Sequence, residues 1–116
     1  MLIPSHRRPF LQSFVAVCYD CASDRAQTRN GVRQITEQLV AAGNFNVVAR
    51  KVFQQHGRIT AAYTLAESHC FIEAYPDRNI VLVDILACTR FNKRAVRQSL
   101  VTMVKPRRII VRGKRF

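Results

Sequence analysis

Acidic residues are scarce in this chain of 116 residues, which has seven aspartates and glutamates against nineteen lysines and arginines. The formal charge of +12 at pH 7 favours contact with phosphates or other anions, which makes nucleic acid a candidate partner. The positive residues are dispersed along the chain, and only the tail from Lys105 to Phe116 is dense. Zinc fingers, aromatic RNA-binding signatures and KH-type GxxG loops are absent. A solvated basic face and a nucleic-acid surface therefore both stay open as interpretations.

Long hydrophobic runs are also missing. The longest, residues 80–88, is interrupted by Asp84 and is much shorter than the roughly 20 residues of a membrane helix. Residues 10–18 imitate the apolar part of a signal peptide, but Gln12 and Ser13 interrupt them and no small-residue cleavage site follows. We therefore expect no membrane span and a cytoplasmic protein.

Motifs that would identify a metal site or a common hydrolase are lacking as well. Cys18 and Cys21 have the spacing of a zinc or redox site, but Cys70 and Cys88 do not form the second ligand pair that zinc needs. We expect reduced thiols and no metal. A glycine-rich phosphate loop, HExxH and GxSxG are also absent, which removes most familiar nucleotide-binding and hydrolase schemes.

The apolar pattern that is present predicts one domain over residues 1–116, with flexible ends at residues 1–9 and 113–116. Strands are predicted at residues 10–18, 44–55, 59–65, 69–75, 80–88 and 107–112, and helices at residues 30–42 and between Asn92 and Lys105. The order β-α-β-β-β-β-α-β favours an α+β two-layer sandwich, with an antiparallel-rich sheet and both helices on one face. A second copy of the chain would cover the other face.

Ser68, between Glu67 and His69, is the remaining candidate for chemistry. Adjacent residues on a strand point to opposite faces, so Ser68 and His69 do not form a catalytic dyad. Spacing alone favours a structural serine.

The segment that begins at Thr60 nevertheless resembles the central part of the prokaryotic-type S-adenosylmethionine decarboxylases. It has that family's residues at matching spacing: Thr60, Glu67-Ser68-His69, Tyr75-Pro76-Asp77, Asp84 and Cys88. The predicted first strand, both helices and the final Lys-Pro-Arg-Arg strand also fall where the family has them. The most specific feature is the Glu-Ser-His triplet followed by a cysteine twenty residues after the serine.

The resemblance implies a pyruvoyl-dependent decarboxylase of S-adenosylmethionine in spermidine synthesis, made as a self-cleaving proenzyme. The Ser68 hydroxyl would attack the carbonyl of Glu67, and β-elimination would then cut the chain and leave a pyruvoyl group at position 68. The ketone would form a Schiff base with the substrate and accept the electron pair released with CO₂. Cys88 matches the family's proton donor.

Further roles follow from the same resemblance. Thr60 matches a hydroxyl residue that assists cleavage, and Phe53 and Tyr75 lie close to the positions of aromatic substrate contacts. The resemblance also implies a homodimer with sites near the subunit interface.

Glu73 departs from the family pattern, which has a histidine five residues after the serine to remove a proton during β-elimination. A carboxylate can act as a general base in place of that histidine. It can also favour a substrate with a second cation, and some relatives decarboxylate arginine or ornithine. A third interpretation is an unprocessed, non-enzymatic homologue whose basic surface binds nucleic acid or an acidic partner.

Overall fold

Six strands and two helices follow one another in the predicted order. The computed structural model describes residues 10–116, so the prediction for residues 1–9 lies outside the described residues. The elements are β1 (Gln12–Cys21), the short 3₁₀ helix η1 (Arg25–Gln27), α1 (Arg29–Ala42), β2 (Val47–Gln55), β3 (Arg58–Leu65), β4 (Ser68–Tyr75), the 3₁₀ helix η2 (Pro76–Arg78), β5 (Ile80–Ala87), α2 (Lys93–Val104) and β6 (Pro106–Arg115). β6 extends beyond its predicted end at residue 112, because Gly113, Lys114 and Arg115 pair with β1.

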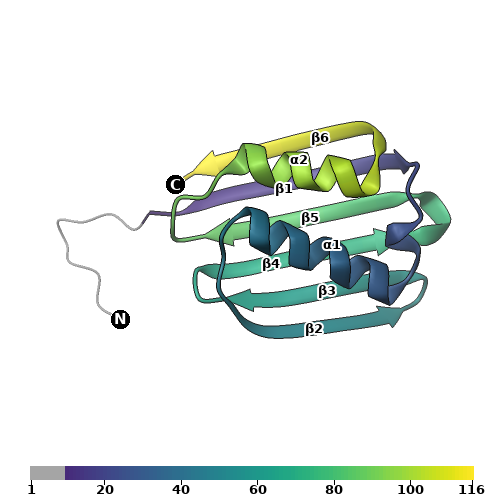
Figure 1. Cartoon of the computed structure of the whole chain (residues 1–116), viewed down its shortest axis with the longest axis horizontal. Coiled ribbons are helices and arrows are strands. Elements are labelled where there is room, and N and C mark those ends of the chain that lie inside the picture. The colour runs from purple at the N-terminus through teal and green to yellow at the C-terminus, as the bar shows by residue number, and fades with distance from the viewer. Residues whose placement is uncertain (1–9) are drawn as a thin grey trace.

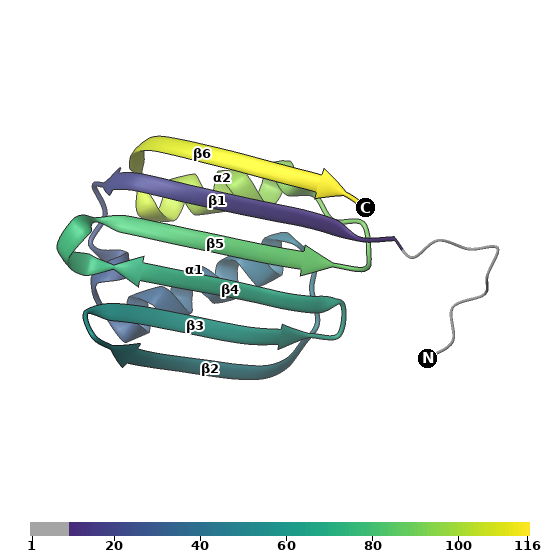
Figure 2. The same ribbon diagram turned by 180° about the vertical axis from the view of Figure 1, so that it is seen from behind.

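The strands form one sheet in the order β2-β3-β4-β5-β1-β6, and every neighbouring pair is antiparallel. β1 lies between β5 and β6, so the first strand of the chain pairs with the last two. Both helices cover the same face of the sheet (Figure 1), and the opposite face carries no helix (Figure 2). The predicted two-layer α+β sandwich is confirmed.

The core lies between the sheet and the helices, as the alternation along β4 illustrates. Cys70, Ile72 and Ala74 are fully buried on the helix side, whereas Phe71 on the other side is 39% exposed. Successive strand residues point to opposite faces, and β1 and β5 show the same alternation, whereas the edge strands β2 and β6 contain no buried residue. The largest fully buried side chains are Tyr63, Phe14, Ile35, Leu39, Ile59, Ile72, Ile85, Leu100, Val32, Val81, Val83 and Val96.

Side-chain caps fix where the two helices begin. The Thr28 hydroxyl accepts a hydrogen bond from the Gly31 amide at 3.0 Å, and the Asn92 side-chain oxygen accepts one from the Ala95 amide at 3.0 Å. Each cap satisfies an amide that has no partner within its helix. Asn92 is the predicted cap of the second helix. Within residues 10–116, neither helix combines the length and apolar character needed to cross a bilayer.

The helix-free face of the sheet is largely apolar at its centre. Val15 on β1 is 40% exposed there, and the half-buried Val17 and Leu82 lie beside it. We call this surface the open face. A contiguous apolar surface of this kind is typical of an interaction site.

Side chains on the two faces of the sheet should contribute differently to the free energy of unfolding. We expect Ile85→Ala, which removes a fully buried side chain from the helix side, to lower the free energy of unfolding by about 2–5 kcal/mol. Val15→Ala, on the open face of the neighbouring strand, should cost less than about 1 kcal/mol in the isolated chain. Urea denaturation at a protein concentration low enough to keep the chain monomeric measures both. Equal losses would contradict a core confined to one face.

Candidate functional site

The turn between β3 and β4 carries the predicted cleavage site. Leu65 and Ser68 pair across it, so only Ala66 and Glu67 connect the strands. Two-residue hairpins normally place their connecting residues at positive φ. Here the positive φ falls on Ser68, at 151°. L residues rarely adopt this conformation, and holding one there costs on the order of 1–3 kcal/mol.

Asn46, just before β2, holds this turn from one side. Its backbone amide and its side-chain amide each donate a hydrogen bond of 2.9 Å to the carboxylate of Glu67. Its carbonyl oxygen also accepts a hydrogen bond from the Ala66 amide at 2.8 Å. The donors favour the charged form and lower the pKa of Glu67. Glu67 is a buried residue, so these bonds also compensate for its burial.

Cys88, immediately after β5, approaches the turn from the other side. Its backbone amide donates a hydrogen bond of 2.9 Å to the carbonyl oxygen of Glu67, the carbonyl of the predicted scissile bond. Cys88 is exposed, whereas the other three cysteines are buried. Burial raises the pKa of Cys18 and of Cys70 to about 12. Cys88 is therefore the cysteine that a substrate can reach.

Thr60 and Glu73 form a second group. They pair across β3 and β4, and Phe53 pairs with Thr60 from β2, so the three lie in one row on the open face. Thr60 is buried, and its hydroxyl has no hydrogen-bond partner among residues 10–116. Such an oxygen ordinarily has a partner in the assembled protein.

The carboxylate of Glu73 contacts two neighbours. Its Oε2 accepts a hydrogen bond of 3.1 Å from the Tyr75 hydroxyl and lies 3.7 Å from a guanidinium nitrogen of Arg58. The predicted substrate contacts Phe53 and Tyr75 thus lie with Thr60 and Glu73. The Lys51 ammonium lies 5.5 Å from the centre of the Phe53 ring.

The two groups lie apart within one chain. Ser68 and Glu73 are five positions apart on β4, which corresponds to about 16 Å at the rise of an extended strand. The sequence indicated one site, but the chain places Glu67, Ser68 and Cys88 at one end of β4 and the second group near the other. Glu73 therefore cannot contact Ser68 of its own chain.

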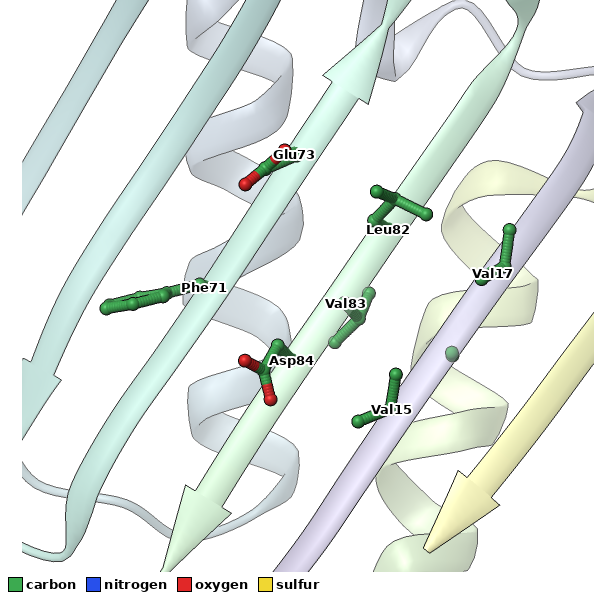
Figure 3. Close-up of a pocket in the computed structure, with 8 residues that line it drawn as sticks. Val15, Val17, Phe71, Glu73, Leu82, Val83 and Asp84 are labelled. Atoms are coloured by element: carbon green, nitrogen blue, oxygen red, sulfur yellow. The ribbon is translucent and has the colours of Figure 1, made fainter.

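A hollow of about 260 Å³ lies between the groups on the open face. Figure 3 shows Glu73, Leu82 and Val17 on neighbouring strands, with Asp84 and other side chains beside them. Apolar groups make most of its wall, and Glu73 and Asp84 supply two carboxylates. Its lining residues are Val15, Ala16, Val17, Phe71, Glu73, Leu82, Val83 and Asp84.

His69 contacts two residues that line this hollow, Phe71 and Asp84. Its ring stacks on Phe71 with centroids 4.5 Å apart, and its Nε2 lies 3.5 Å from a carboxylate oxygen of Asp84. This arrangement agrees with the inference that Ser68 and His69 form no dyad.

Comparison with known proteins decides the family. The family model described as S-adenosylmethionine decarboxylase matches residues 12–114, nearly the whole chain. The chain belongs to the S-adenosylmethionine decarboxylase family. No curated protein sequence matches it.

A solved structure of an S-adenosylmethionine decarboxylase has the same fold. The crystal structure of the adenosylmethionine decarboxylase from Aquifex aeolicus VF5 superposes with a TM-score of 0.82 and 21% sequence identity, covering 93% of this chain and 91% of that chain. At this identity the similarity establishes the fold alone. The resemblance found in the sequence is confirmed at the level of family and fold.

Two residues of this candidate site, Asn46 and Asp84, were not predicted from the sequence as site residues. Asn46 lies 21 residues before Glu67, and no motif links them. Asp84 was noted only as part of the family pattern, although its position in the β5 alternation could have placed it beside Phe71 on the open face.

The Asn46–Glu67 hydrogen bonds make stability depend on pH. A carboxyl group with a lowered pKa in the folded state adds stability above its unfolded pKa and loses it as pH falls through the folded pKa. Asn46→Ala removes the side-chain donor and keeps the backbone one, so we expect it to cost about 1–3 kcal/mol near neutral pH and progressively less as pH falls through the folded pKa of Glu67, below the ordinary carboxyl value of about 4.3. Urea denaturation across this range measures the difference, with the exposed Gln55→Ala as control. A pH-independent loss in Asn46→Ala would contradict the assignment.

Proposed function

We propose that this chain is the proenzyme of a pyruvoyl-dependent decarboxylase, that it cleaves itself between Glu67 and Ser68, and that it acts on S-adenosylmethionine in spermidine synthesis. One observation carries the proposal. The carbonyl oxygen of Glu67 accepts a hydrogen bond of 2.9 Å from the Cys88 amide, and Ser68, the residue after Glu67, is held at a φ of 151°. These features suit a peptide bond prepared for attack.

The first step of cleavage would be addition of the Ser68 hydroxyl to the Glu67 carbonyl carbon. The Cys88 amide would donate to the oxygen as negative charge develops there, in the manner of an oxyanion hole. Breaking the carbon–nitrogen bond would convert the peptide into an ester and release the backbone strain at Ser68. Asn46 would keep the turn fixed throughout.

The second step needs a base. Removal of the Ser68 α-proton would expel the Glu67 carboxylate and cut the chain into fragments 1–67 and 68–116. The dehydroalanine left at position 68 would take up water and lose ammonia, giving the pyruvoyl group. Thr60 and Glu73 are the candidates for assisting these steps, but their own chain holds them about 16 Å from Ser68.

A homodimer would bring the scissile bond of one chain to Thr60 and Glu73 of the other. If two open faces pack together around a two-fold axis that passes over the middle of β4, the scissile bond and Cys88 of one chain would come close to the partner's Thr60 and the partner's Glu73. The apolar centre of the open face and the unpaired hydroxyl of Thr60 support this assembly. The hollow would then lie inside the dimer, shielded from water.

The pyruvoyl ketone would supply the electron sink for decarboxylation. The Cys88 thiol, which is exposed beside the cleaved bond, would deliver the proton to the substrate carbon. The apolar wall of the hollow suits a ligand with an apolar or aromatic part, and Glu73 and Asp84 suit a cation. S-adenosylmethionine combines both. The two carboxylates also favour arginine or ornithine, which is the second candidate reaction.

Intact-mass measurement tests self-cleavage directly. We expect the 13.3 kDa chain to give fragments 1–67 and 68–116 on incubation, the second with a pyruvoyl group at its start. Ser68→Ala, which lacks the attacking hydroxyl, should stay whole. A wild-type chain that also stays whole would instead support the unprocessed homologue.

Glu73→His tests the departure from the family pattern. An imidazole is ordinarily a stronger base than a carboxylate, so we expect faster cleavage, by roughly tenfold or more. Glu73→Gln keeps the size of the side chain but removes the base, and it should slow cleavage. The rate of appearance of the two fragments measures both. Unchanged rates in both variants would exclude Glu73 from the processing step.

Cys88→Ala separates cleavage from decarboxylation. The backbone amide is retained, so we expect the fragments to form, whereas CO₂ release from carboxyl-labelled S-adenosylmethionine should fall about 100-fold or more. Arginine and ornithine assayed in parallel identify the substrate class. Full decarboxylation by Cys88→Ala would rule out the thiol as proton donor.

A further inference from the structure

The positive charge is concentrated at one edge of the folded chain. Residues 85–116 contain ten of the nineteen lysines and arginines and none of the seven aspartates and glutamates. Their formal charge is therefore +10, against +2 for residues 1–84. This segment forms the end of β5, then α2 and β6, which lie together at one edge of the sheet (Figures 1 and 2). These cations surround the edge strand β6 on both sides of the sheet. Arg108, Arg112 and Lys114 are in register with Tyr19, Val15 and Ser13 of the open face, whereas Lys93, Arg94 and Arg97 belong to α2 on the helix side.

We call this surface the basic edge and define it by nine exposed residues. They are Arg90, Arg94, Arg97, Lys105, Arg107, Arg108, Arg112, Lys114 and Arg115. The half-buried Lys93 lies among them. Seven of these ten cations are arginines, whose guanidinium groups can bind phosphate with two parallel hydrogen bonds.

Three cations gather around the end of β6 and the Phe10 ring. The guanidinium groups of Arg90 and Arg115 lie 5.1 and 4.9 Å from the centre of the same Phe10 ring. The Lys93 ammonium lies against Gly113, where an added Cβ would be 2.6 Å from it. Every ion pair in the described part of the chain involves residues outside the basic edge. The crowded cations therefore repel one another without a neighbouring carboxylate to offset the cost.

Stability and solubility do not explain this arrangement. Lys93 and Arg94 occupy the first turn of α2, where cations oppose the helix dipole. Protecting an edge strand from aggregation needs charges on β6 alone and leaves those on α2 and at Arg90 unexplained. Membrane insertion is disfavoured because the apolar side of α2 is buried in the core.

We propose that the basic edge binds the phosphate backbone of a single-stranded nucleic acid. α2 lies flat on the sheet and presents no protruding helix to a major groove, which disfavours duplex DNA. Aromatic rings among the cations suit unpaired bases: Arg108 lies 5.1 Å from the centre of the Tyr19 ring, and Phe116 is 65% exposed. The proposal is independent of self-cleavage.

Fluorescence anisotropy with labelled oligouridylate and oligothymidylate tests this and distinguishes RNA from DNA. The full chain carrying Ser68→Ala keeps one covalent state throughout. We expect binding that weakens steeply with salt, each neutralised phosphate adding about 0.7 to the slope of log affinity against log salt concentration. The triple variant Arg90→Gln, Arg112→Gln, Arg115→Gln should bind about tenfold or more weakly and lower that slope.

A matched control removes the same charge elsewhere. Arg25→Gln, Arg29→Gln, Arg33→Gln changes three exposed cations at η1 and α1, and we expect at least about a third of the affinity to remain. Circular dichroism confirms that both variants are folded. The proposal is overturned if the two triple variants lose affinity equally, if nothing binds at about 0.15 M salt, or if phosphatidylserine vesicles retain the protein more strongly than either oligonucleotide does.

Discussion

The register of β4 between β3 and β5 fixes every residue of the site. Ser68 pairs with Ala87, which brings the next residue, Cys88, to the carbonyl of Glu67. The same ladder pairs Thr60 with Glu73 further along the strand. A shift of one residue would exchange the faces of β4 and separate both groups from their neighbours. The buried side chains of Cys70, Ile72 and Ala74 oppose that shift.

The one-sided cover of the sheet has consequences for assembly. The helices bury the helix side of the four central strands, and the cost of leaving the other face exposed to water is offset only if something packs on it. The scissile bond and the pair Thr60–Glu73 lie toward opposite ends of β4, and Phe71 and Glu73 of this strand line the apolar hollow. A symmetric partner would close the hollow and complete two sites at once.

Local signals predicted most of the fold, and the family pattern predicted which residues to consider. Alternation along β4 gave its two faces, and Asn92 gave the start of α2. What could not be predicted includes the hydrogen bonds from Asn46 to Glu67, which join distant segments, and the positive φ of Ser68. The distance between Ser68 and Glu73, in contrast, follows from their spacing once both lie on one strand. The basic edge was not predicted, although residues 85–116 hold ten cations and no acidic residue. The pairing of β6 with β1 at the edge of the sheet is visible only in the folded chain.

The central claim is that one chain supplies the scissile bond and another the assisting groups. Co-expression of two defective chains tests it most directly. The Ser68→Ala chain keeps Thr60 and Glu73, and a chain with Thr60→Ala and Glu73→Ala keeps Ser68. Intact-mass analysis should find the second chain whole when expressed alone and cleaved after residue 67 when expressed with the first. A second chain that is cleaved as fast alone as in the mixture, or that stays whole in a dimer with the first while the wild type cleaves, would contradict the claim.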